Sequence, residues 1–247
     1  MYTENIGHHI SGSFNKDLEE IRHKVLVMGG LVEQQLDQSI QAFNHGDMEM
    51  AEQVIQQDNE IDAMEIRIEQ ECTNILALRQ PAAFDLRFLL AVLKIIHELE
   101  RMGNKAKRIA QMTVRLAVNQ AHIYHHEMDH MADLVKHMLL DALNAFARLS
   151  LDSVPVITQQ DAKVDREYDS ILRQLITRMM EDSRNITRTL DVLWTVRALE
   201  RIAGHACHIC EHLVYALKGE HVNHMSPQEL ATKLTTPGHE HTLQARH

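Results

Sequence analysis

The spacing of apolar residues along the chain predicts long helices and almost no sheet. From Phe14 onward, apolar residues recur every three or four positions, as they do on the buried face of an amphipathic helix. Residues 44–47 (Asn-His-Gly-Asp) then combine a helix stop with an N-cap for the next helix. The first predicted helix is therefore about thirty residues long, and its apolar face consists of Phe14, Leu18, Ile21, Val25, Met28, Val32, Leu36, Ile40 and Phe43.

Two more predicted helices complete the first half of the chain. The second runs from about Met48 to Leu78 and ends before Pro81, because proline disfavours a helical conformation at the residue that precedes it. The third begins near Ala82 and extends toward Val118.

The second half of the chain repeats the first. A shift of 103 positions aligns Val32 with Val135 and Asp62 with Asp165, and the third helices align at a shift of 100. Self-similarity of this length indicates a duplicated structural unit. Because long helices joined by short connections pack antiparallel, we predict an all-α fold of two tandem three-helix bundles related by a pseudo-twofold axis.

The domain boundaries follow from these helices. The first repeat spans residues 14–118, residues 119–126 link the two halves, and the second repeat spans residues 127–219. Residues 1–13 form a polar lead. Residues 220–247 are polar and His-rich, and we expect them to be disordered.

Composition narrows the class of protein. Aromatic residues make up 4% of the chain, and it contains 9 glycines and 4 prolines, so few residues break helices. The formal net charge of −10 disfavours nucleic acid and anionic lipid as partners. No run of about 18 apolar residues occurs, and residues 1–30 lack a signal-peptide pattern. We therefore expect a cytoplasmic protein without membrane insertion.

Three cysteines are too few for a disulfide framework and are typical of a reducing compartment. Two of them, Cys207 and Cys210, form a C-x-x-C motif, and nearby histidines are His205, His208 and His212. A four-ligand zinc site would need a second ligand pair, and the sequence places none for it. The pattern favours cysteines that simply occupy a helix face.

Acidic residues of the second predicted helix coincide with its apolar face. On a helical wheel, Asp62, Glu65 and Glu69 fall within about 40° of Asp58. Glu100 of the third predicted helix also falls inside an apolar stripe. A carboxylate in a core is unfavourable by several kcal/mol unless a cation or hydrogen-bond donors meet it, so each of these acids needs a partner.

The second repeat keeps part of this arrangement. Asp161 and Asp165 match the pair formed by Asp58 and Asp62, and Glu200 is the counterpart of the third-helix glutamate. Carboxylates that converge from neighbouring helices suit hard cations such as Mg²⁺, Mn²⁺, Ca²⁺ or iron. The residues alone leave a second interpretation open, in which the acids are neutralised by basic side chains of the protein, namely Arg79, Arg87, Arg101, Lys107 and their counterparts.

Several segments are distinctive when taken together: Met28–Glu33, Cys72–Ala77, Arg79–Pro81 with Asp85–Arg87, Leu99–Arg101, Asp141–Ala147, Val164–Tyr168, Met179–Ser183 and Leu199–Ile202. With them the chain resembles the PhoU family, accessory regulators of bacterial high-affinity phosphate transport. The resemblance covers about residues 8–222 and both repeats.

The resemblance implies two three-helix bundles, a cytoplasmic location, a homodimer and no catalytic step. It also implies two partners, the ATPase subunit of a Pst-type phosphate ABC transporter and a PhoR-type histidine kinase. In that role the protein represses phosphate uptake and the Pho regulon when phosphate is sufficient. Finally, it implies clusters of iron or another divalent metal, with Mg²⁺, Mn²⁺ and Zn²⁺ left open, held by Glu/Asp-x-x-x-Asp motifs.

These metal motifs correspond here to Asp58, Asp62, Glu100, Asn104, Asp161, Asp165 and Glu200. The chain departs from them twice, because Asn104 and Gly204 stand where the family has aspartate. Asn104 still offers a neutral oxygen, and His208 and Glu211 lie on the Glu200 side of their helix, where they can substitute. Lys107 can replace a cation in the first site. We therefore expect weaker metal binding than the family pattern implies.

Two other classes compete with this interpretation. A carboxylate-bridged metalloenzyme needs Glu-x-x-His motifs aimed inward from two helices. Glu20 and His23 lie off the apolar face, and the motif ending at His130 has no counterpart in the other repeat. The remaining class is a metal-binding helical bundle or scaffold without a role in phosphate homeostasis, which measurements of bound metal and partner binding would distinguish.

Overall fold

A computed structural model describes residues 12–118, 126–222, 225 and 227–235 of the chain. Within these residues the protein is helical and has no strand, which confirms the all-α prediction. The helices are α1 (Gly12–His45), α2 (Met48–Arg79), α3 (Ala83–Val118), α4 (His126–Arg148), α5 (Val154–Glu181), the 3-10 turn η2 (Ser183–Asn185), α6 (Ile186–Lys218) and α7 (Pro227–Thr235). None of the described helices is long and apolar enough to cross a bilayer.

Local chemistry sets the ends of these helices. At the start of α2, the Asp47 side chain accepts a hydrogen bond from the Met50 backbone N–H at 3.0 Å, as an N-cap does. Pro155 lies in the first turn of α5, where its missing N–H is harmless. Gly219 ends α6 in the left-handed conformation (φ 73°), which glycine adopts without steric penalty.

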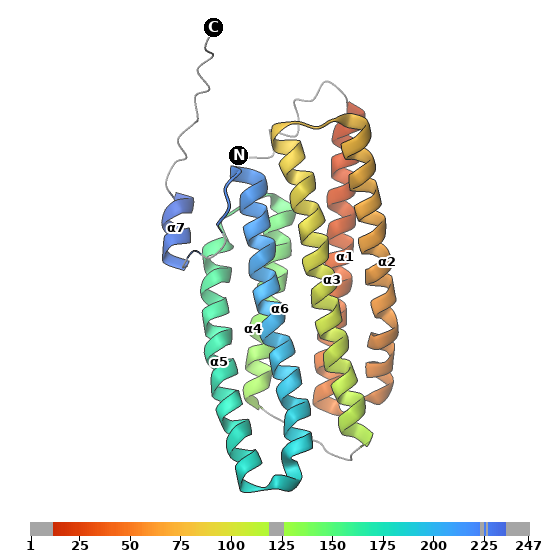
Figure 1. Cartoon of the computed structure of the whole chain (residues 1–247). Helices are drawn as coiled ribbons and strands as arrows, with labels where there is room; N and C mark the ends of the chain where they lie inside the picture. The colour runs from red at the N-terminus through yellow and green to blue at the C-terminus, as the bar shows by residue number, and fades with distance from the viewer. Residues whose placement is uncertain (1–11, 119–125, 223–224, 226, 236–247) are drawn as a thin grey trace.

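The six long helices of the described chain form two three-helix bundles that lie side by side (Figure 1). Helices α1, α2 and α3 form the first bundle, and α4, α5 and α6 form the second. The most extensive contact between the bundles joins α3 to α6, and α1 also packs against α4. We call the α3–α6 contact the seam, because it holds the two repeats together.

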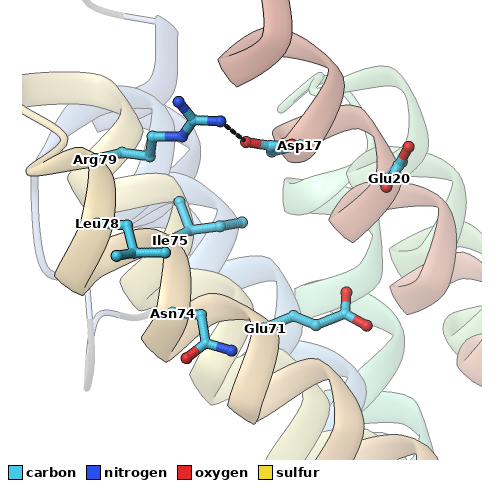
Figure 2. Close-up of a pocket in the computed structure, with 7 residues that line it drawn as sticks. All are labelled: Asp17, Glu20, Glu71, Asn74, Ile75, Leu78 and Arg79. Atoms are coloured by element: carbon cyan, nitrogen blue, oxygen red, sulfur yellow. Dashed lines mark hydrogen bonds and ion pairs between the residues drawn. The ribbon is translucent and has the colours of Figure 1, made fainter.

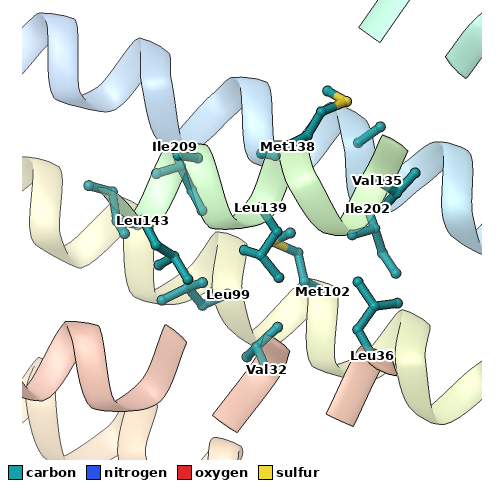
Figure 3. Packing of buried hydrophobic residues seen from close by; sticks show 14 of the residues in the cluster. Val32, Leu36, Leu99, Met102, Val135, Met138, Leu139, Leu143, Ile202 and Ile209 are labelled. Carbon is teal, nitrogen blue, oxygen red and sulfur yellow. The ribbon is translucent and has the colours of Figure 1, made fainter. Parts of the chain in front are cut away.

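One hydrophobic core runs through both bundles and across the seam. Figure 3 shows side chains of α1, α3, α4 and α6 that meet in it, among them Val32, Leu99, Leu139 and Ile202. Each of these four residues is fully buried. The apolar faces of the separate helices therefore pack into one shared core. Polar residues on the seam consequently contact side chains of both repeats.

The expected disorder of residues 220–247 was wrong for the part that forms α7. Val222 and Leu230 are buried, at 2% and 4% exposure, and Leu234 packs against the same core. The Lys218 ammonium donates a hydrogen bond to the Leu234 carbonyl oxygen at 3.1 Å. A few apolar residues on one face of α7 are thus enough to pack this mostly polar helix against the core. Residues 1–11, most of the predicted linker (119–125) and residues 236–247 lie outside the described part.

Candidate functional site

The first set of predicted ligands lies along α2 and α3. Asp58 is almost fully buried, at 1% exposure, whereas Asp62 and Glu100 are half-buried and Glu69 and Asn104 are exposed. The prediction that the α2 acids line the middle of the buried face is therefore confirmed for Asp58 and wrong for Glu69. At about 100° per residue, the buried stripe of α2 is centred about 45° to one side of Asp58, near Val54 and Cys72, while Asp62 and Glu69 fall on the other side.

A cation of the protein itself neutralises Asp58. The Lys107 ammonium on α3 lies 2.8 Å from Asp58 Oδ2. The Gln35 amide on α1 donates a hydrogen bond to Asp58 Oδ1 at 3.1 Å. The hydrogen bond to Asp58 raises the pKa of Lys107. Gly103 leaves room for this network, since a Cβ there would lie 3.1 Å from Gln35 Oε1. At Asp58 the arrangement matches neutralisation by a basic side chain.

The remaining acids of this cluster face a histidine that sequence reasoning missed. Ligand atoms of Glu65, His97 and Glu100 lie within 4.8 Å of one another. Arg101 Nε donates to His97 Nε2 at 3.0 Å, so His97 Nδ1 carries the proton and donates to Glu65 Oε1 at 3.2 Å. The Asn104 amide donates to Glu100. Burial, and then the charges of Glu65 and Asp62, raise the pKa of Glu100, as expected of carboxylates that converge without a metal.

The second set lies on α5 and α6. Asp161 and Glu200 are half-buried, whereas Asp165 is exposed. Burial, and then the nearby charges of Asp165 and Glu200, raise the pKa of Asp161 to about 6. Arg201 Nε lies 3.3 Å from Glu200 Oε2, but among the described residues no lysine or arginine lies within ion-pair distance of Asp161 or Asp165. This cluster, unlike the first, has no ammonium at its centre.

The two cysteines of the C-x-x-C motif have different surroundings. Cys210 is buried in the core, and burial raises its pKa to about 12. Cys207 hydrogen-bonds Asp161, and burial and the charge of Asp161 raise its pKa as well. Burial therefore keeps both thiols protonated at neutral pH.

Two of the arginines considered as partners of the buried acids lie elsewhere. Arg79 pairs with Asp17 of α1 at 3.1 Å, at the mouth of a cavity of about 360 Å³ between α1 and α2 that contains none of the predicted ligands (Figure 2). Arg87 donates to the Ala216 carbonyl oxygen at 3.3 Å. The interpretation in which these two arginines neutralise the buried acids is therefore wrong for these contacts.

A basic groove lies between α3 and α6. Its volume is about 400 Å³, and its lining consists of Asn104, Lys105, Arg108, Trp194, Arg197, Ala198 and Arg201. Trp194 is 44% exposed, and the guanidinium carbons of Arg108 and Arg197 lie 5.7 and 5.8 Å from its ring centroid, within cation–π range. The groove connects the two acid clusters, because Asn104 contacts Glu100 and Arg201 contacts Glu200.

The ionisation of Asp161 gives a testable pH dependence. Because its pKa is raised from 3.8 to about 6, the folded state binds this proton more tightly than the unfolded state, and stability falls as pH rises from about 4 through 6. Asp161→Asn is expected to raise the free energy of unfolding at pH 7.5 by about 1–2 kcal/mol after allowance for solvent screening, and to have no effect at pH 4. Urea unfolding with a chelator present measures both, and the exposed Asp169→Asn is the matched control. Equal effects at both pH values would contradict the assignment.

Taken together, the fold and the clusters define a protein of two tandem three-helix repeats, each with an acid cluster between its second and third helices. The model of the PhoU domain matches the chain twice, over residues 25–113 and 128–213. The chain belongs to the PhoU family.

Relatives match over almost the whole chain. The phosphate-specific transport system accessory protein PhoU of Serratia marcescens is 44% identical over 230 residues, which cover 93% of this chain and 95% of that protein. The PhoU homolog of Pseudomonas putida is 42% identical over 232 residues, covering 94% and 91%.

Solved structures agree with the fold. The crystal structure of PhoU from Pseudomonas aeruginosa is similar with a TM-score of 0.81 at 41% identity, covering 84% of this chain and all of that one. The phosphate transport system regulatory protein PhoU from Streptococcus pneumoniae gives a TM-score of 0.79 at 32% identity, covering 85% and 99%.

Proposed function

We propose that this protein is a cytoplasmic, non-enzymatic regulator of phosphate homeostasis. It couples a Pst-type phosphate ABC transporter to a PhoR-type histidine kinase, and it represses uptake and the Pho regulon when phosphate is sufficient. The observation that carries the proposal is the match to phosphate-transport accessory proteins along 93–94% of the chain, both repeats included. The proposed regulator is a homodimer, which light scattering on the purified protein tests.

The basic groove is the docking surface in this proposal. The chain carries a net charge of −10, yet four basic side chains gather around an exposed tryptophan on the seam. Arginine and tryptophan are the side chains that dominate binding energy at protein interfaces. By charge complementarity the groove fits an acidic segment of a partner protein, whose carboxylates pair with the guanidinium groups while an apolar side chain covers Trp194.

The acid clusters are proposed sites for a divalent metal such as Mn²⁺, Mg²⁺ or iron, at reduced affinity. In the second cluster the carboxylates of Asp161, Asp165 and Glu200 fit a hard cation, since no ammonium competes at Asp161 or Asp165 among the described residues. In the first cluster Lys107 already neutralises Asp58. The ligand set proposed there narrows to Asp62, Glu65 and Glu100, with the Asn104 oxygen available after rotation of its amide.

A reporter experiment tests the regulatory role and the docking surface together. In a strain that lacks the gene, a phosphate-starvation reporter is expected to be active in high phosphate, and the wild-type gene is expected to silence it. Arg197→Glu and Trp194→Ala are expected to leave the reporter at least about tenfold more active than wild type, because they remove the charge and the aromatic anchor of the groove. Arg166→Glu, on the exposed face of α5, is the matched control and is expected to complement.

The outcomes separate the parts of the proposal. If the wild-type gene leaves the reporter active, the phosphate role is wrong. If it silences the reporter and both groove variants do so equally well, with normal circular dichroism, the role stands and the groove is not the docking surface. A protein that silences the reporter without binding any divalent metal would be a scaffold whose buried acids serve packing alone.

A further inference from the structure

A second kind of polar cluster lies on the seam, on the other side of α3 from the acid cluster. Glu98 of α3 is surrounded by three histidines of α6. His205 Nδ1 lies 2.6 Å and His208 Nδ1 3.3 Å from Glu98 Oε2, and His212 Nε2 lies 3.8 Å from Glu98 Oε1. None of the seven positions that match the family motifs belongs to this group, but His208, the candidate substitute ligand beside Glu200, does.

The cluster is held by the fold rather than by flexible surface chains. The side chains of Glu98, His205 and His212 are only 13%, 10% and 15% exposed, whereas His208 is 50% exposed and stands at the rim. The spacing of the histidines (i, i+3 and i+7) puts all three on the face of α6 that meets α3. A small solute can therefore reach the centre past His208, while the other side chains are fixed in place.

The donor set indicates which solute fits. Three imidazole nitrogens and one carboxylate oxygen are the ligands of a borderline transition metal such as Zn²⁺, whereas Mg²⁺ and Ca²⁺ prefer oxygen alone. Ligands of a tetrahedral zinc ion, with bonds of 2.0–2.1 Å, lie about 3.3 Å from one another. The separations of 2.6, 3.3 and 3.8 Å between the Glu98 carboxylate and the three imidazoles bracket this value. The ligand atoms of Glu98, His205 and His208 all lie within 4.8 Å of one another, whereas His212 approaches the other carboxylate oxygen of Glu98.

We propose that Glu98, His205, His208 and His212 bind one transition-metal ion of the zinc class, which links α3 to α6 across the seam. Binding replaces the hydrogen bonds between the imidazoles and Glu98. The proton on each bound ring nitrogen moves to the other ring nitrogen of a neutral imidazole, or leaves to solvent from an imidazolium. In the described structure burial opposes ionisation of Glu98, but hydrogen bonds from the three histidines outweigh burial and hold its pKa below the usual range. The ion then holds the two repeats together at a point that neither repeat contains alone.

Cobalt(II) titration of the full-length, chelator-treated protein tests the proposal. Four-coordinate Co²⁺ absorbs visible light much more strongly than six-coordinate Co²⁺, so the spectrum reports geometry as well as binding. One equivalent of Co²⁺ is expected to give the strong visible absorption of a four-coordinate ion. One equivalent of Zn²⁺ is then expected to displace the Co²⁺ and abolish this absorption. Glu98→Gln and His208→Ala are each expected to weaken this binding about tenfold or more. His208 is half-exposed, so its replacement leaves the core intact.

The matched control is His130→Ala, which removes another interhelical histidine–carboxylate pair, with Glu167 at 2.7 Å. This variant is expected to keep the wild-type spectrum. Zn²⁺ is also expected to raise the melting temperature of the wild type and of His130→Ala but not of Glu98→Gln.

Three outcomes would overturn the site. One is an unchanged strong spectrum in both Glu98→Gln and His208→Ala, which would assign the metal to histidines elsewhere in the chain. Another is a weak, six-coordinate spectrum that disappears in Asp161→Asn, which would assign it to the acid cluster. The third is no binding at one equivalent. None of these results depends on the phosphate role, because the readout is metal binding by the purified protein.

Discussion

Lys107→Met is expected to lower the free energy of unfolding by about 3–5 kcal/mol, because it leaves a buried carboxylate without its cation. Asp58 is 1% exposed, and the Lys107 ammonium lies 2.8 Å from it. Among the described residues, the only other hydrogen bond to the Asp58 carboxylate is a neutral one from Gln35. Urea unfolding followed by circular dichroism at pH 7.5, with a chelator present, measures the loss.

A second interhelical lysine pair provides the control. Lys24 of α1 lies 2.5 Å from Glu71 of α2, but both side chains are about 40% exposed (39% and 40%). Lys24→Met is therefore expected to lower stability by no more than about 1 kcal/mol. Adding Asp58→Asn to Lys107→Met is expected to restore most of the stability, since the unpaired charge is then gone. A loss no larger for Lys107→Met than for Lys24→Met would show that solvent or another cation reaches Asp58.

The general fold could be predicted from the sequence because the 3.6-residue spacing of apolar side chains can be recognised within each helix, without knowledge of the rest of the chain. The stripe from Phe14 to Phe43 gave the position of α1 and its buried face, and Pro81 gave the end of α2 to within a residue or two. Helix α7 was not predicted because its apolar residues are few. A short polar segment docks only if a neighbouring core accepts it, and that core belongs to other parts of the chain.

The sites were less predictable because a helical wheel gives the face of a residue and not the partner opposite it. It placed Asp58 in the core but did not identify Gln35, which arrives from another helix. It also implied burial for Glu69, although the packed stripe of α2 is centred to one side of the acids. Glu98 and His205 meet only because α3 lies against α6, and nothing in either segment specifies that contact.

Gly204→Asp is expected to strengthen binding of Mn²⁺ to the second acid cluster by about tenfold or more, a gain of about 1.4 kcal/mol for each factor of ten. Gly204 lies one turn beyond Glu200 on α6, and no atom lies within 4 Å of the position that a Cβ would take there. The new carboxylate thus enters open space one turn from Glu200. Without metal, it adds like charge to a cluster in which the pKa of Asp161 is already raised to about 6.

Asn104→Asp is the matched substitution in the first cluster, and its gain is expected to be smaller. There the Lys107 ammonium lies 2.8 Å from Asp58 and competes with a metal for the carboxylates. Electron paramagnetic resonance of free Mn²⁺ compares the two variants with the wild type, and circular dichroism confirms that they are folded. Equal gains would mean that Lys107 does not limit the first cluster. A folded Gly204→Asp protein with unchanged Mn²⁺ affinity would mean that Asp161, Asp165 and Glu200 do not form a metal site.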